Sequence, residues 1–221
     1  MNKGKLFIVA TPIGNLEDIT LRAIRTLKEC DVILCEDTRR AKILLKHYGI
    51  EKPLVSYFEG NEEKRIPEVL EMLREGKNIA LISDAGTPLI SDPGYKLVRR
   101  CREEGFDVIP IPGPSAVISA LSVSGLETDR FAFIGFPPKK KGKRLKLLES
   151  LKDFEGSLVF YVSPYKVKEF LKELLEVFGD RHICICREMT KMFEEYVYGK
   201  ISEVMEKVKE KGEFVIVVGK E

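Results

Sequence analysis

Two patterns of hydrophobic and polar residues alternate along the chain. Short apolar runs bounded by polar and turn residues are typical of buried strands. In the N-terminal half, such runs lie at residues 5–10, 31–35, 53–58, 78–82 and 107–111. Longer stretches, with apolar residues three and four positions apart, follow these runs and indicate helices packed on a sheet. The alternation predicts a mostly parallel, helix-covered sheet.

The helical stretches have recognisable ends. Asp18 is expected to cap the first helix, and Gly105 is expected to stop the fourth. The strongest helical pattern follows Ser163-Pro164, where Ser163 suits the N-cap and Gly179 ends the apolar face. Helices are expected at residues 18–27, 36–49, 62–75, 95–104, 117–123, 163–179 and 202–211.

A polar stretch, residues 125–129, separates this first half from a second set of strands and helices. The strands of the second half are expected at residues 130–138, 156–162, 182–187, 193–198 and 213–218. Each half is long enough to bury its own core. We therefore expect two α/β domains, residues 1–114 and 115–221, with a cleft between them.

The most unusual polar stretch is Ser83–Gly94, which directly follows the apolar run 78–82. It contains two Asp, two Gly, two Pro and three hydroxyl residues, and almost nothing suited to a core. Open α/β sheets bind ligands at the carboxyl ends of their strands. Asp84 could accept a hydrogen bond from a ribose hydroxyl or a ligand ammonium, which indicates cofactor binding. An ordinary strand-to-helix loop is the alternative.

Several function classes lose support because their motifs are missing. The chain has no G-x-G-x-x-G, no G-x-x-x-x-G-K-[ST] and no nucleophile elbow, and its only histidines are His47 and His182. NAD enzyme, NTPase and hydrolase interpretations are therefore disfavoured. The five scattered cysteines are expected to be reduced, mostly buried thiols rather than zinc ligands: Cys30, Cys35, Cys101, Cys184 and Cys186.

Charge is concentrated in one segment. The net charge is only +2, yet residues 139–146 contain six cations in eight positions, which leaves the rest of the chain net negative. This distribution favours a local contact with a polyanion. There is no apolar run long enough to span a membrane and no signal-peptide pattern, so a cytoplasmic protein without a membrane partner is expected.

The motifs together resemble those of a known family. They are Val9–Ile19, Glu36–Arg39, Ser83–Gly94, Pro112–Ala116, Phe133–Pro137, Arg187–Lys191 with Glu194-Glu195, and Lys211–Ile216. From about Lys5 to its C-terminus the chain resembles the tetrapyrrole methylases, the class III group of S-adenosylmethionine-dependent enzymes, and within it the members that act on ribosomal RNA. The resemblance implies a two-domain α/β homodimer, with the cofactor between the domains, that 2′-O-methylates a decoding-centre cytidine in 16S rRNA of the small ribosomal subunit.

The resemblance also implies which residues hold S-adenosylmethionine. They are Pro12, Asp84, Ala85, Gly86, Thr87, Ser115 and Ala116, joined by Tyr161 and Val162 from the second domain. One departure concerns the motif that usually reads Tyr-Glu-Ser-Pro-His-Arg. This chain has Val162, Tyr165 and Lys166 in place of its Glu, His and Arg, so no catalytic role is assigned to those three positions.

A ribose hydroxyl is a poor nucleophile at neutral pH, so a general base or a cationic neighbour is expected, and no metal is needed. Glu188 and Lys191 are the preferred catalytic pair among the candidates Glu36, Asp37, Arg39, Arg187, Glu188, Lys191 and Glu195. Pro137-Pro138 and Gly142 predict a loop rather than a helix at residues 139–146. The expected RNA contacts are Arg39, Arg40, Lys139, Lys140, Lys141, Lys143 and Arg144.

Two other functions stay open. The first is a small-molecule methyltransferase that acts on a tetrapyrrole, since a shared fold does not fix the substrate. The second is a non-enzymatic RNA-binding module with a relic cofactor pocket. Six clustered cations favour a polyanion over a porphyrinoid ligand.

Overall fold

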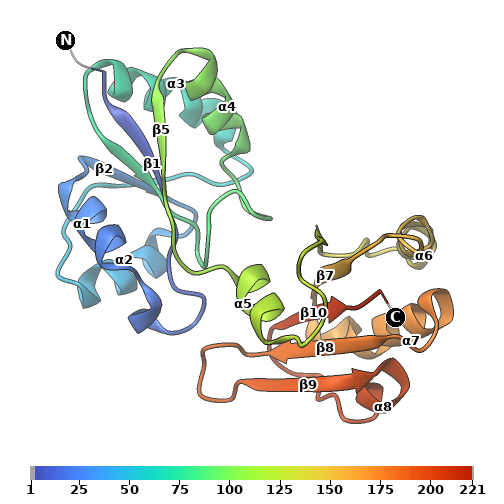
Figure 1. Cartoon of the computed structure of the whole chain (residues 1–221). Coiled ribbons are helices and arrows are strands. Elements are labelled where there is room, and N and C mark those ends of the chain that lie inside the picture. Colours follow the sequence, from blue (N-terminus) through green and yellow to red (C-terminus); the bar gives the residue numbers. More distant parts are fainter. Residues whose placement is uncertain (1–2, 221) are drawn as a thin grey trace. The chain divides into compact units, whose positions relative to one another are not determined.

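The computed structural model describes residues 3–220. The chain divides into two compact units, the first ending at Ser115 and the second beginning at Ala116. Each unit has its own five-stranded sheet with helices (Figure 1). The expectation of two α/β domains is confirmed, while the limits 1–114 and 115–221 stay a prediction about which residues fold together.

The sheet of the first unit is entirely parallel. Its strands are β1 (Lys5–Val9), β2 (Val32–Cys35), β3 (Leu54–Ser56), β4 (Ile79–Leu81) and β5 (Asp107–Ile111), in the order β3-β2-β4-β1-β5. All five were predicted from apolar runs. The runs are unbroken because both faces are buried: Ile79 and Leu81 point into one core, and Ala80 points into the other.

Helices cover both faces of this sheet. They are α1 (Leu21–Glu29), α2 (Thr38–His47), α3 (Glu62–Arg74) and α4 (Tyr95–Glu103). Helices α1 and α2 pack on one face, and α3 and α4 on the other. The cap expected at Asp18 is wrong, because Asp18 ends a 3₁₀ turn (Leu16–Asp18) and the Thr20 hydroxyl caps α1 by accepting from Ala23 N–H at 3.0 Å. Gly105 does adopt a positive φ, +71°, after α4.

The sheet of the second unit is mixed. Its strands are β6 (Phe131–Gly135), β7 (Ser157–Val162), β8 (His182–Arg187), β9 (Glu195–Lys200) and β10 (Phe214–Val218), in the order β6-β7-β10-β8-β9. Only β6 and β7 pair in parallel; the other pairs are antiparallel. The expectation of a mostly parallel sheet is therefore wrong for this unit. The reason is that β10 enters between β7 and β8, and β8 turns back directly into β9.

The helices of the second unit are α5 (Ala116–Val123), α6 (Lys141–Ser150), α7 (Val167–Phe178) and α8 (Ile201–Met205). The apolar stripe of α7 joins the core that lies on the sheet, as its spacing predicts. A 3₁₀ turn, Pro164–Lys166, separates Ser163 from α7, and Gly179 ends the helix at a φ of +77°. The helix expected at residues 202–211 ends at Met205.

The loop predicted at residues 139–146 is wrong from Lys141 onwards, because α6 begins there. A Cβ added at Gly142 would contact nothing within 4 Å, so the glycine lies on an open side of the helix. Glycine in a helix costs about 1 kcal/mol relative to alanine. Burial of Leu148 in the core of the second unit offsets this cost.

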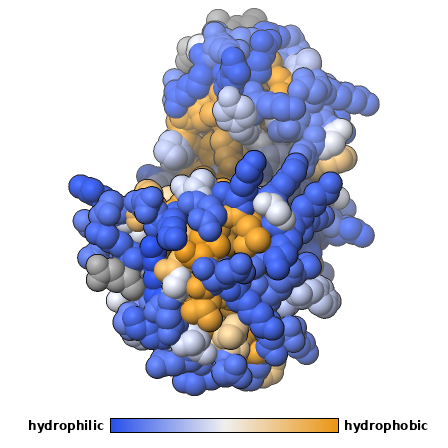
Figure 2. Space-filling model, turned by 90° about the vertical axis from the view of Figure 1, so that its right-hand side faces the viewer, coloured by the Kyte–Doolittle hydropathy of each residue, from blue (hydrophilic) through white to orange (hydrophobic). Residues whose placement is uncertain are grey.

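The surface is mostly polar. On the face drawn in Figure 2, charged and polar side chains cover most of the area and hydrophobic ones gather in limited patches. The five cysteines are free and buried, as expected from the sequence. Within residues 3–220, no helix combines the length and apolar character that crossing a membrane requires.

Candidate cofactor site and catalytic loop

The topology of the first unit creates a place for a ligand. Strands β1, β2 and β4 are neighbours, and Ile8, Leu34 and Leu81 lie in register across them. The chain leaves β1 and β2 toward helices on one face, and it leaves β4 toward α4 on the other face. Ligands of open α/β sheets bind where neighbouring strands diverge in this way. The Ser83–Gly94 loop starts at this point.

The loop after β1 and the loop after β4 are joined by backbone hydrogen bonds. Thr11 N–H donates to the Gly86 carbonyl at 2.9 Å, and Gly86 N–H donates to the Thr11 carbonyl at 3.0 Å. Gly86 has a φ of +77°, and a Cβ there would come within 3.3 Å of Ile13 Cγ2. The Thr87 hydroxyl donates to the Pro114 carbonyl at 3.0 Å, which connects the loop after β5. Three strand ends are thus held together.

Asp84 is fixed by groups at the start of α2. Its carboxylate accepts from Asp37 N–H at 3.3 Å and lies 3.2 Å from Arg40 Nη1. Its own N–H donates to Glu36 Oε1 at 3.3 Å. The Asp84 side chain keeps 29% exposure, so part of the carboxylate is open to a ligand. Arg40, expected to contact RNA, therefore also has a partner within the chain.

Negative charge gathers around this carboxylate. Burial raises the pKa of Glu36 above its ordinary value, and repulsion from Asp92 raises it further. Burial also raises the pKa of Asp92, and repulsion from the nearby Asp84 raises it further. Asp37 behaves oppositely, because its hydrogen bond from the Arg39 side chain holds its pKa well below the usual range. Half-buried acids that repel one another favour a cationic ligand.

The Ser83–Gly94 loop, called the central loop below, has a strained backbone. Leu89 and Ser91 have φ values of +74° and +62°, in the left-handed region that side chains rarely adopt. A Cβ at Gly94, where φ is +130°, would come within 2.8 Å of Leu81 Cδ2. Such strain costs free energy and is concentrated at ligand sites. An ordinary connecting loop would not need it.

The cavity that these loops enclose within the first unit is small. It measures about 60 Å³ and includes Pro12, Thr11, Ser83, Asp84 and Arg40 in its lining. Cofactor pockets usually measure about 300–1,000 Å³. The first unit alone therefore encloses only part of a nucleoside-sized ligand. No group of three or more possible metal ligands occurs in the part of the chain that the structure describes.

In the second unit, strand register brings two predicted sets of residues to one end of the sheet. Phe214, near the start of β10, pairs with Val162 on one side and with Arg187 on the other. Tyr161 and Val162, expected at the cofactor, therefore lie at the same end as the loop that starts at Glu188. The Tyr161 ring also packs edge-on against the rings of Phe133 and Phe136, with centroids 4.8 and 5.4 Å apart.

Glu188 and Lys191 form an ion pair in this loop. Lys191 Nζ lies 3.3 Å from Glu188 Oε1 and 2.9 Å from Glu213 Oε2. Glu188 Oε1 also accepts from Glu213 N–H at 2.8 Å. A Cβ at Gly212 would come within 2.7 Å of Glu188 Cγ, so only glycine allows this approach. The other candidates of this motif, Arg187 and Glu195, pair with each other at 2.8 Å.

The same contacts set the charges of the pair. The Glu213 N–H hydrogen bond and the Lys191 ammonium hold the pKa of Glu188 below its ordinary value. Burial lowers the pKa of Lys191, but the Glu213 and Glu188 carboxylates outweigh it and leave that pKa raised. Lys191 is therefore protonated at neutral pH and can act as a cation, not as a base.

Three residues in or beside this loop lie in the quoted motifs, but the sequence assigned no role to them. Glu213 and Gly212 stand 24 or more positions after Glu188, and no local spacing links them to it. Thr190 has a φ of +69°, and among the described residues its buried hydroxyl has no hydrogen-bond partner. Glu188 itself has a φ of +51°. Strain and an unsatisfied hydroxyl in one loop are typical of a functional site.

The cations of the basic segment, residues 139–146, lie in two different environments. Lys139, Lys140, Lys141 and Lys143 are exposed, and within residues 3–220 no carboxylate lies within 4.0 Å of their ammonium groups. Arg144 is only 4% exposed and lies between Glu173 and Glu169, with Nη2 2.7 Å from an oxygen of each. The expectation that Arg144 contacts RNA therefore needs correction, since its guanidinium is enclosed by the chain's own carboxylates.

Comparison with known proteins gives the class to which this fold and site belong. The family model of the Tetrapyrrole (Corrin/Porphyrin) Methylases matches residues 5–205. The chain belongs to this family, as the resemblance of its motifs predicted. Solved structures of uroporphyrin III C-methyl transferase from Thermus thermophilus share the fold at 22% identity. The native form has a TM-score of 0.67, and a form complexed with S-adenosyl homocysteine has 0.68; each comparison covers 98% of this chain and 97% of that one.

Closer relatives share one name. A protein from Thermotoga maritima named ribosomal RNA small subunit methyltransferase I is 53% identical over 99% of this chain and 100% of its own length. Proteins of the same name from Bacillus subtilis and Escherichia coli O157:H7 are 48% and 45% identical. These two comparisons cover 97% and 98% of this chain, and 75% and 78% of the relatives.

Proposed function

We propose that the chain is an S-adenosylmethionine-dependent methyltransferase acting on RNA of the small ribosomal subunit. The observation that carries this proposal is 53% identity to a relative of that name over 99% of this chain and 100% of the relative. In finer detail, the acceptor is the ribose 2′-hydroxyl of a decoding-centre cytidine in 16S rRNA. Such a substrate places the enzyme in the cytoplasm.

The strand ends of the first unit suit the cofactor. When bound, S-adenosylmethionine supplies an electrophilic methyl group on a sulfonium. Asp84 is placed to accept from a ribose hydroxyl or an ammonium, and the acids Glu36 and Asp92 favour the cationic charge. Glycine at position 86 lets the backbone approach a ligand closely. The proposed binding residues are Pro12, Asp84, Ala85, Gly86, Thr87 and Ser115, with Ala116, Tyr161 and Val162 from the second unit.

Glu188 and Lys191 are the proposed catalytic pair. The Lys191 ammonium stabilises the negative charge that develops on the ribose oxygen, as a fixed cation can. Glu188 keeps Lys191 in place, and its ionised carboxylate offers an acceptor for the hydroxyl proton. RNA phosphates are held by Lys139, Lys140, Lys141 and Lys143, with Arg39 and Arg40 at the start of α2.

A tetrapyrrole is the second candidate substrate. The solved structures with that activity in their names share only 22% identity with this chain, a level at which the fold alone is shared. The relatives named for ribosomal RNA are 44–53% identical. The four lysines of the basic segment without a carboxylate partner in the described residues match phosphates, but they could also pair with the carboxylates of a uroporphyrin, so the identity to the RNA-named relatives decides between the two substrates.

Methyl transfer tests the proposal directly. Purified small ribosomal subunits and protein-free 16S rRNA are incubated separately with the enzyme and radiolabelled S-adenosylmethionine, and the labelled nucleotide is mapped. Label on the 2′-oxygen of a single cytidine is the expected result. Label on a base would contradict the proposed 2′-O-methylation. RNA binding without detectable cofactor binding would instead indicate a binding module.

A homodimer is the proposed assembly, since symmetric dimers are the commonest oligomers. Light scattering should then give about twice the chain mass of 25.1 kDa. A mass equal to that of one chain at working concentration would refute the dimer.

A further inference from the structure

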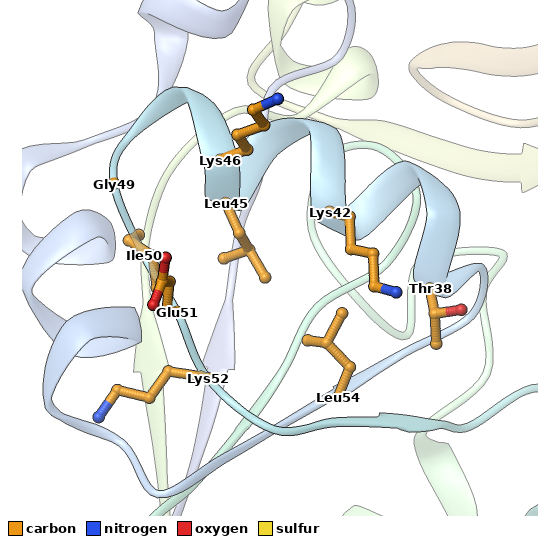
Figure 3. A pocket seen from close by; sticks show the side chains of 9 residues that line it. All are labelled: Thr38, Lys42, Leu45, Lys46, Gly49, Ile50, Glu51, Lys52 and Leu54. Carbon is orange, nitrogen blue, oxygen red and sulfur yellow. The ribbon is translucent and has the colours of Figure 1, made fainter.

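A hollow in the first unit lies outside the proposed cofactor site. It measures about 660 Å³ and is formed by one side of α2, from Thr38 to Lys46, and by residues 49–54, which lead into β3. Figure 3 shows Leu45 and Leu54 facing each other across it, with Lys42 beside Thr38 at one end and Glu51 with Lys52 at the other. The hollow therefore has an apolar floor and a charged rim.

The rim is cationic and unpaired. Lys42, Lys46 and Lys52 lie on it, against the single acid Glu51. Among the described residues, no carboxylate comes within 4.0 Å of these three ammonium groups, and α2 itself contains no acidic residue.

The opposite face of the same sheet differs. There, the cations of α3 and α4 mostly have carboxylate partners: Arg65, Arg74, Lys96, Arg99 and Arg100 each form ion pairs. Most cations on that face are neutralised by carboxylates of the chain itself. In the described part of the chain, Lys42, Lys46 and Lys52 on the α2 face are not neutralised in this way and are available to an external partner.

The helix dipole explains only part of this charge. A cation in the last turn of a helix is stabilised by the partial negative charge of the unpaired carbonyls. Lys46 stands in that turn. Lys42 lies one turn earlier, and Lys52 lies outside the helix, so neither gains from this effect.

We propose that this hollow, together with Lys42, Lys46 and Lys52, binds the phosphodiester backbone of the RNA substrate; this inference rests on the proposed function. Lys42 and Lys46 are about 6 Å apart along the helix axis, so both can reach one RNA strand. Leu54 is partly exposed in the apolar floor and offers a surface for a sugar or base, while Leu45 beneath is only 3% exposed. Arg39 and Arg40 at the start of α2 are paired with Asp37 and Asp84 and are not part of this surface.

Salt-dependent binding of protein-free 16S rRNA tests this surface. The variant Lys42→Ala/Lys46→Ala is compared with the parent and with Lys64→Ala/Lys207→Ala. The control removes the same charge from two exposed lysines that also lack a carboxylate within 4.0 Å in the described part of the chain. Each lost phosphate contact lowers the slope of log affinity against log salt by about 0.7–0.9. The double variant should therefore lose about 1.4–1.8 in slope and bind about 20-fold more weakly at about 0.15 M salt.

The control variant should bind RNA like the parent, and all three proteins should bind S-adenosylmethionine equally and melt at the same temperature. Equal RNA affinity and slope in the parent and the Lys42→Ala/Lys46→Ala variant would overturn this inference alone. A defect with assembled subunits but not with protein-free RNA would also overturn it, because the partner would then be a ribosomal protein. A parent enzyme that neither binds RNA nor methylates it would overturn the proposed function itself.

Discussion

Arg144 is the residue whose replacement we expect to cost most in the second unit. Its side chain is 5% exposed and that of its partner Glu173 is 3% exposed. The guanidinium contacts both Glu173 oxygens and Glu169, and it donates to the carbonyls of Pro138 and Lys139 at 3.1 and 3.0 Å. It therefore attaches the start of α6 to α7. Arg144→Met keeps most of the packing volume but leaves the Glu173 carboxylate buried without its cation.

Removing one partner of a buried ion pair costs about 3–5 kcal/mol, because the remaining charge is uncompensated. That cost is a large share of the 5–15 kcal/mol by which domains are stable. Replacing both partners in Arg144→Met/Glu173→Leu should recover most of it, since well-packed apolar residues are often as stable as a buried pair. Lys143→Met, an exposed change on the same helix, should stay within about 0.5 kcal/mol of the parent.

Urea denaturation followed by circular dichroism measures these free energies, and amide hydrogen exchange in α6 and α7 assigns them to the second unit. The exchange measurement is needed because a two-unit chain does not have to unfold in one step. A loss below about 1 kcal/mol in Arg144→Met, or a double variant no more stable than the single one, would refute the reasoning.

Other changes test the proposed sites. Asp84→Ala should weaken S-adenosylmethionine binding by about 1.5–3 kcal/mol, the value of a hydrogen bond to a charged group, and unchanged affinity in calorimetry would contradict the assignment. Replacing Lys139, Lys140 and Lys141 with Ala should lower RNA affinity and its salt slope but not cofactor affinity; an unchanged slope would mean that these lysines are only solvated. Asp92→Asn should stabilise the free enzyme at neutral pH, because the raised pKa of Asp92 means that folding disfavours its ionised form. This gain should disappear below the ordinary carboxyl pKa, where both states are protonated, and a gain that persists in acid would exclude the electrostatic cause.

The strands could be predicted because their apolar runs are buried on both faces, as β2 and β4 show. Pairing direction could not be predicted in the same way. In the first unit, each strand is followed by a helix that returns the chain, so the strands run parallel. In the second unit, only seven residues, 188–194, separate β8 from β9. That length allows a hairpin but not a helical crossover. The length of the connection therefore indicates the antiparallel direction of pairing, which apolar periodicity does not.

The proposed site residues also differ in how well the sequence could predict them. The central loop, Ser83–Gly94, stood out because unusual residues cluster locally in the sequence, whereas Glu188 and Lys191 became candidates through the resemblance of their motif to that of the family. Arg144 was misjudged because the acids that enclose it, Glu169 and Glu173, are 25 and 29 positions away. Its neighbours in sequence are lysines, so local charge predicted exposure. Only the packing of α6 on α7 separates the buried cation from the exposed ones.

The free energy stored in the first unit has a functional explanation. Leu89 and Ser91 are strained, and Glu36 and Asp92 are half-buried acids whose raised pKa values show that their surroundings disfavour the ionised forms. These features destabilise the chain without a ligand, and nothing in the core requires them, because the strands and helices are complete up to Leu81 and from Tyr95. A ligand with positive charge relieves the repulsion and turns this cost into affinity for that ligand. In the first unit, the strained residues Leu89 and Ser91 lie in the loop that we propose binds the sulfonium cofactor, and Glu36 lies beside that loop.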